Sequence, residues 1–200
     1  MSTPPIPHKP ARWQGAAILS IGFVVLLYLV EAWDSLHHQD LDADGIQPLS
    51  ERGLGGILWA PLLHANWSHL WANTVPALVL GFLVVVQGVG RGLSATAIIW
   101  LGGGLGTWLI GGIGQPPGAT HIGASGLIFG WLAYLIVFGL FTRRPWQILI
   151  GVGVLLVYGG VLAAALPGTY GVSWQGHLCG AVAGVVAAHM LSKPERRARM

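Results

Sequence analysis

Charged residues are scarce in this 200-residue chain: Asp, Glu, Lys and Arg make up 8% of it, and hydrophobic residues make up 54%. That balance excludes an ordinary soluble globular domain, in which about a quarter of the residues are charged. A single cysteine, Cys179, excludes a disulfide within the chain. The net charge of +3 does not indicate nucleic-acid binding, because the Lys and Arg residues stand in small groups beside apolar runs.

Glycine is abundant, with 31 residues, but it follows no three-residue period, which excludes a collagen-like chain. Membrane helices tolerate glycine and use it where two backbones approach closely. A bilayer core of about 30 Å needs roughly 20 apolar residues of helix. Stretches of about this length occur at residues 15–33, 69–89, 93–114, 123–141, 146–166 and 175–192. The sequence therefore predicts an all-α polytopic membrane protein, a bundle of six transmembrane helices.

Basic residues mark one side of the predicted bundle. Nine of the ten Lys and Arg residues fall in the two tails and in alternate connections, and Arg52 falls on the opposite side. By the positive-inside rule both tails, 1–14 and the basic 193–200, are cytoplasmic, and the long loop 34–68 lies outside. Residues 15–192 then form one membrane domain. The pattern suits a bacterial plasma membrane, with an organelle membrane as the alternative.

Polar side chains open three of the predicted spans. The second, fourth and sixth spans run from outside to inside, so their first residues lie near the outer membrane face. These residues include His69, Asn73, Ser125 and His177. Polar groups inside a membrane are costly and tend to face other helices or a water-filled cavity. Four such groups at one depth indicate a single site.

Each of these residues also has a purely structural explanation. A membrane serine commonly bonds its own helix backbone, a histidine near a helix end commonly lies in the interface, and a His-Asn pair at i and i+4 can clamp two helices. Glycines spaced four apart, however, give the fourth and sixth spans small faces: Gly126, Gly130, Gly176, Gly180 and Gly184. Packing through those faces would bring Ser125 and His177 within hydrogen-bond reach, as a serine nucleophile and its general base require.

Three motifs together resemble the rhomboid family of intramembrane proteases: G-A-S-G opening the fourth span, G-H-x-x-G opening the sixth and H-x-x-x-N opening the second. The six-span core and the long first outer loop fit the same family. The resemblance implies a serine endopeptidase that hydrolyses peptide bonds in or next to transmembrane segments. Its partners would be membrane-anchored protein substrates and the lipid bilayer, and it would need no metal and no cofactor.

The resemblance also assigns roles to single residues. The positions that correspond to the family's catalytic machinery are Ser125 as nucleophile, His177 as general base and then acid, and His69 and Asn73 as oxyanion hole. Gly123 and Gly126 would keep the turn at the nucleophile uncrowded. Phe129 stands where the family often has a tyrosine that stacks on the catalytic histidine. The phenyl ring keeps the stacking surface without the hydroxyl, so we expect activity to survive.

Two other functions compete with the protease. An inactive relative of the family that binds membrane proteins would usually lack the serine or the histidine, and this chain has both. A small transporter would carry polar groups at the bilayer midplane and inverted repeats. His64 and His121 lie near the predicted site, but the chain has no HExxH motif, so we expect no metal there.

The outer loops carry two further expectations. The segment 167–174, with Gly168 and Gly171 as hinges, is expected to form a movable cover over the site. A Trp-Arg pair that some members of the family carry in the first outer loop is missing. The packing of that loop is therefore left open by the resemblance.

Overall fold

The computed structural model describes residues 12–37, 41–168 and 172–197, and within them the chain is helical. Seven α-helices follow in order: α1 (Arg12–His37), α2 (Glu51–Trp59), α3 (Trp67–Val86), α4 (Val89–Ile110), α5 (Ser125–Thr142), α6 (Pro145–Tyr158) and α7 (Trp174–Arg197). Three 3-10 helices accompany them: η1 (Leu41–Asp44), η2 (Ala60–Leu62) and η3 (Gly159–Ala165). In this part of the chain the extended pairing is one isolated bridge between Ile46 and His121. The predicted all-α bundle is confirmed.

Five helical segments are long and apolar enough to cross a membrane: α1, α3, α4, α5 and the continuous segment Pro145–Ala165. The sixth predicted span, 175–192, is α7, which is not among those five and carries Gln175, His177 and His189. It nevertheless packs along α5 and α4 in the same bundle. The protein is therefore a multi-pass membrane protein with a rhomboid-like arrangement of helices.

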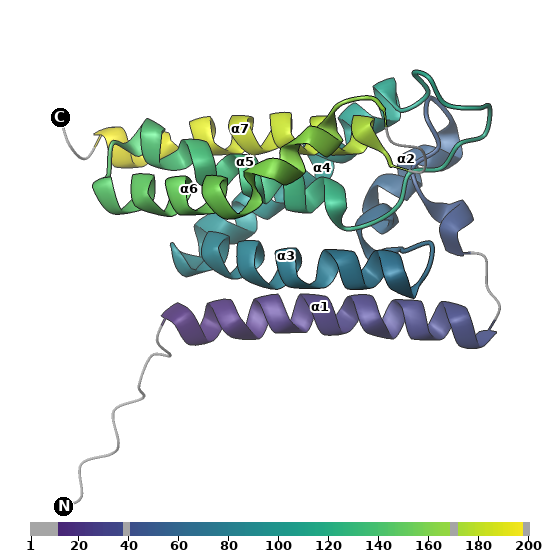
Figure 1. Cartoon of the computed structure of the whole chain (residues 1–200), viewed down its shortest axis with the longest axis horizontal. Coiled ribbons are helices and arrows are strands. Elements are labelled where there is room, and N and C mark those ends of the chain that lie inside the picture. The colour runs from purple at the N-terminus through teal and green to yellow at the C-terminus, as the bar shows by residue number, and fades with distance from the viewer. Residues whose placement is uncertain (1–11, 38–40, 169–171, 198–200) are drawn as a thin grey trace, which may run out of the picture.

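Helix α5 is the centre of the bundle, as Figure 1 shows, with α4, α6 and α7 around it and the α3–α1 pair stacked along one side. Its span is 67% buried inside the protein, against 17% for the span that contains α6, so α5 is the least exposed of the five candidate spans. Tyr134 and Phe138 stack on each other in the core with ring centroids 4.9 Å apart. This apolar half lies below the polar opening of α5 and anchors it.

Glycines bring α5 and α7 into direct backbone contact. A methyl group added to Gly180 would lie 1.9 Å from the carbonyl oxygen of Gly126, and one added to Gly184 would lie 2.1 Å from that of Gly130. No larger residue fits at such distances without moving a helix. The predicted glycine faces therefore do meet, and they place the first turns of α5 and α7 side by side.

The first outer loop is held by two tryptophans of α4. The indole N–H of Trp100 donates to the Ile57 carbonyl at 2.9 Å, and that of Trp108 donates to the Ser50 carbonyl at 2.9 Å. Ser50 also caps α2 by accepting from the Gly53 amide at 3.0 Å. These contacts answer the question left open by the missing Trp-Arg pair, because indole-to-backbone bonds from α4 fix the loop instead.

Some boundaries differ from those expected. The predicted span 123–141 begins as a helix only at Ser125, because Gly123 has a φ of +110°, outside the helical region. The predicted span 146–166 is α6 continued by the tighter η3. Of the expected cover 167–174, residues 169–171, Gly171 included, lie outside the described residues, as do 1–11 and 198–200 of the tails.

Candidate active site

Ser125 is the first residue of α5 and follows a tightly held turn. The Gly123 amide donates to the Ala60 carbonyl at 2.8 Å, and the Ala124 amide donates to Nε2 of His64 at 3.4 Å. The positive φ of Gly123 swings the chain into the helix at this point. As a result the Ser125 hydroxyl sits at the amino-terminal end of a helix, where backbone N–H groups lack intrahelical partners and the helix dipole favours negative charge.

His177 lies on the first turns of α7 and reaches Ser125. Its Nε2 is 2.9 Å from the Ser125 Oγ, and its Nδ1 is 2.9 Å from the carbonyl oxygen of Ala164. A carbonyl can only accept, so Nδ1 carries the ring proton and Nε2 accepts the hydrogen bond from the serine hydroxyl. The ring of Phe129 stacks on the imidazole, with centroids 4.1 Å apart and planes 7° apart. The imidazole is thus held at both nitrogens and on one face.

His69 and Asn73 lie one helical turn apart on α3, and both are near the Gly123–Ser125 turn. The imidazole of His69 lies so close to Gly123 that an added methyl group there would be 2.7 Å from its Cε1 and 3.7 Å from the Ser125 Oγ. The amide of Asn73 is buried and donates to the His69 carbonyl at 3.2 Å. Both side chains therefore border the space in front of the serine.

One cavity of about 790 Å³ joins these side chains. It runs from the connections that precede α3 and α5 past the Ser125–His177 pair, between α3 on one side and η3 on the other. Its lining includes Ser125, His177, His69, Asn73, Phe129, Pro76, Leu80, Tyr158 and Val161. Ser125, His177, His69, Asn73 and Phe129 are thus brought together in one cavity, which has both polar and apolar walls. Gly126 lies instead against α7, where an added methyl group would be 3.3 Å from the Gly176 carbonyl oxygen.

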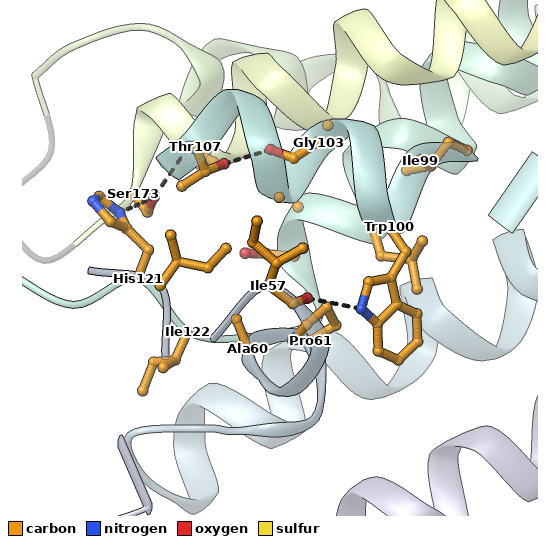
Figure 2. Close-up of a pocket in the computed structure, with 18 residues that line it drawn as sticks. Ile57, Ala60, Pro61, Ile99, Trp100, Gly103, Thr107, His121, Ile122 and Ser173 are labelled. Carbon is orange, nitrogen blue, oxygen red and sulfur yellow. Dashed lines mark hydrogen bonds between the residues drawn. The ribbon is translucent and has the colours of Figure 1, made fainter. Parts of the chain in front are cut away.

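A second, much smaller pocket of about 50 Å³ also has Ser125 in its lining, and Figure 2 shows the side chains around it. Ile57, Trp100 and Thr107 line it, and the Thr107 hydroxyl donates to the Gly103 carbonyl at 2.8 Å. Because this pocket is so much smaller, the larger cavity is the one that can receive a substrate segment.

Two further histidines are buried beside the site. The pKa of His64 is lowered to about 4, chiefly by burial and also by the neighbouring His69, while a hydrogen bond with the Leu62 backbone opposes both. Burial also lowers the pKa of His121, against a hydrogen bond with the Gly111 backbone. Among the residues that the structure describes, no group of three or more His, Cys, Asp and Glu side chains is placed to hold a metal ion.

The sequence did not assign a role to His64 or to the Ala164 carbonyl, both of which contact the site. His64 is buried, its ring meets that of His69 edge to face with centroids 5.1 Å apart, and it accepts from the Ala124 amide. A third histidine close in sequence to the H-x-x-x-N motif was a signal that could have been used. A main-chain carbonyl leaves no such signal.

This arrangement defines a class: a multi-pass membrane protein in which a serine and a histidine meet at the first turns of two glycine-packed helices. Comparison with known proteins gives the family. A model described as "Rhomboid domain" matches residues 52–194. The chain therefore belongs to the rhomboid family, whose members are generally intramembrane serine proteases.

Several relatives share this assignment or are close in sequence. The chain is 61% identical to the uncharacterised protein Rv1337 of Mycobacterium tuberculosis, over 96% of this chain and 81% of the relative. It is 31% identical to "Rhomboid-like protein 11, chloroplastic" of Arabidopsis thaliana, over 67% of this chain and 51% of that protein. It is 30% identical to "Putative rhomboid protein L523" of a mimivirus, over 66% and 72%. No solved structure matches the chain.

Proposed function

We propose that this protein is an intramembrane serine endopeptidase that cleaves peptide bonds in or next to the transmembrane segments of membrane-anchored proteins. The observation that carries the proposal is the 2.9 Å approach of His177 Nε2 to the Ser125 Oγ, with Nδ1 held by the Ala164 carbonyl. A hydroxyl is a weak nucleophile until a base takes its proton, and a neutral imidazole with a free lone pair on Nε2 is such a base.

The reaction follows from these contacts. Ser125 attacks the scissile carbonyl while its proton passes to His177 Nε2, and the Ala164 carbonyl stabilises the imidazolium through Nδ1–H. His177 then gives the proton to the leaving amine, which breaks the peptide bond and leaves an acyl ester on Ser125. Water, deprotonated by the same imidazole, hydrolyses the ester and restores the serine. The carbonyl thus serves the orienting role that an aspartate has in a Ser-His-Asp triad.

The negative charge that develops on the substrate oxygen needs donors. The N–H of Ser125 at the start of α5 is one, and the side chains of His69 and Asn73 supply the others from α3. A donor aimed at a developing oxyanion contributes about 10²–10³ in kcat. Phe129 keeps the His177 ring in plane and shields it on one face.

The cavity indicates how a membrane-bound substrate reaches the serine. Because its walls pass from the outer loops to apolar residues of α3 and η3, a peptide can enter with part of its length still in the membrane. A hydrogen-bonded helix hides its carbonyls, so the segment that is cut must unwind in the cavity. The positive-inside pattern supports a site near the outer face with both termini cytoplasmic, and the mycobacterial relatives support a bacterial plasma membrane.

The proposal is tested by cleavage of a transmembrane model substrate by the purified protein in detergent. Wild type is compared with Ser125→Ala, His177→Ala and the control Ser192→Ala, which removes another buried hydroxyl of α7, one that donates to the His189 carbonyl at 2.9 Å. We expect wild type and Ser192→Ala to cut, and the two site variants to remain folded and inactive. Cleavage by Ser125→Ala would refute the nucleophile. Failure of the wild type on several substrates would favour an inactive rhomboid-like binder.

A further inference from the structure

A side-chain hydrogen bond joins the turn that precedes α5 to the segment that precedes α7. Nδ1 of His121 lies 2.6 Å from the Oγ of Ser173, and Figure 2 shows the two side chains pointing toward each other. His121 stands four residues before Ser125, and Ser173 stands four residues before His177. The bond therefore links the chain segment just before Ser125 to the segment just before His177.

The partners of His121 determine its tautomer. Its Nε2 lies 3.1 Å from the carbonyl oxygen of Gly111, which can only accept, so Nε2 carries the ring proton. Nδ1 then holds the lone pair and accepts the hydroxyl hydrogen of Ser173. Burial lowers the pKa of His121, which keeps this neutral form at neutral pH. Each of the two ring nitrogens thus has one role and one partner.

Ser173 passes this constraint on to α7. Its Oγ accepts from the Gly176 amide at 3.1 Å, and its carbonyl accepts from the His177 amide at 3.1 Å. These bonds satisfy amides of the first turn of the helix, as an N-capping serine does. The position of the His177 backbone is therefore tied to the position of the Ser173 side chain.

His121 in turn has little freedom to move. Its backbone pairs with Ile46 in both directions, at 3.0 and 2.9 Å, and its side chain is 6% exposed. A methyl group added to Gly111 would lie 2.6 Å from Nε2, so the ring is confined on that side as well. A fixed ring gives Ser173 a fixed partner.

We propose that His121 and Ser173 are positioning residues for the general base. Their hydrogen bond sets the register of the first turn of α7 against the turn before α5, and so holds the Ser125–His177 distance. The glycine contact between Gly126 and Gly180 fixes the same two helices one level deeper. The inference rests on the proposed protease function, and it adds two residues that the dyad needs but that do not touch the substrate carbonyl.

The test uses the full chain with four variants: Ser173→Ala, Ser173→Thr, His121→Phe and the double variant Ser173→Ala/His121→Phe. Ser192→Ala is the matched control. Misplacing a reacting group by about 1 Å can cost about 10² in rate. We expect Ser173→Ala and His121→Phe each to lower kcat about 10- to 100-fold with KM within about twofold, because ground-state binding is untouched. Ser173→Thr, which keeps the hydroxyl, should restore kcat to within about threefold.

Non-additivity is the sharper readout, because the two side chains act through one bond. The double variant should be no slower than the slower single variant. The inference would be overturned if the losses of kcat in the two single variants multiplied in the double variant. It would also be overturned if Ser173→Ala had the same kcat as Ser192→Ala. A failure of Ser173→Thr to restore activity while its thermal unfolding midpoint matches that of the wild type would overturn it as well.

A measurement that needs no activity separates this inference from the proposed function. In protein labelled with ¹⁵N-histidine, the ring signals of His177, assigned with His177→Ala, report its tautomer. We expect the Nδ1–H form in the wild type and a mixture of tautomers in Ser173→Ala. If Ser173→Ala shows this mixture but the wild type cuts no substrate, the proposed protease function is contradicted and the positioning role of Ser173 is supported. If the wild type cuts but the His177 signal is unchanged in Ser173→Ala, the protease function is supported and the positioning role is contradicted.

Discussion

The two sides of α5 are packed in opposite ways. Toward α7 the helix meets another backbone through glycines, and an added methyl group at Gly180 would fall 1.9 Å from the Gly126 oxygen. Toward α3 and η3 it borders a cavity of about 790 Å³. Ser125 and His177, 2.9 Å apart, lie where the closed side borders the cavity, and the donors His69 and Asn73 line the cavity from α3. One face of α5 is thus packed tightly against α7, and another face leaves room for a substrate.

The largest effect is expected from breaking the closed side. Gly180→Ala forces α7 away from α5, so we expect a loss of about 3 kcal/mol in the free energy of unfolding and at least about a 100-fold fall in kcat. Gly153→Ala on α6 is the control, because its methyl group meets nothing within 4 Å. Thermal unfolding in detergent and cleavage rates measure both effects. Equal stability and rate in the two variants would show that the glycine contact is not needed.

On the open side, Asn73→Ala should remove one donor to the oxyanion. We expect kcat to fall by about 10²–10³ with an unchanged unfolding midpoint. Gln87→Ala is the matched control for Asn73→Ala. Gln87 is also buried, at the C-cap of α3, and its side-chain amide also donates to a carbonyl four residues earlier, that of Leu83, at 3.0 Å. A parallel fall in both variants would mean that Asn73 acts on stability and not on the reaction.

Gly123 lies where the two sides meet. Gly123→Ala adds backbone strain at a φ of +110° and pushes on His69, so we expect kcat to fall about 10- to 100-fold. Gly118→Ala separates the causes, because Gly118 also has a positive φ, +80°, but open space around it. If the kcat of Gly118→Ala fell as far, strain in the loop and not the His69 contact would be responsible.

The smallest effect on the cleavage rate is expected at His64, where pH changes stability instead. The pKa of His64 is about 4 in the folded protein and 6.5 when exposed, so the unfolded chain binds more protons between these values. Stability is fully present above pH 6.5 and falls as the pH drops toward 4, by on the order of 3 kcal/mol. His64→Gln should flatten this slope in unfolding midpoints measured from pH 7 to 4. His37→Gln, at an exposed histidine at the end of α1, should leave it unchanged.

The membrane bundle and the meeting of Ser125 with His177 could be predicted because they depend on apolar run length and on four-residue glycine spacing. The hold on the first outer loop could not, since Trp100 and Trp108 bond main-chain carbonyls far away in sequence. The role of the Ala164 carbonyl could not be predicted either, because it too is a main-chain group far in sequence from Ser125, the residue that His177 contacts. It lies in η3, where the predicted span 146–166 tightens into a 3-10 helix, a change that hydrophobicity does not report.

The central claim is that Ser125 is an activated nucleophile, and covalent labelling tests it without any assumption about substrates. A fluorophosphonate reacts with serines whose hydroxyl a base has activated, and mass spectrometry identifies the modified peptide. We expect a single adduct on Ser125 in the wild type and none in His177→Ala, although the serine is still present there. An equal adduct yield in His177→Ala, or labelling of another serine, would contradict the account.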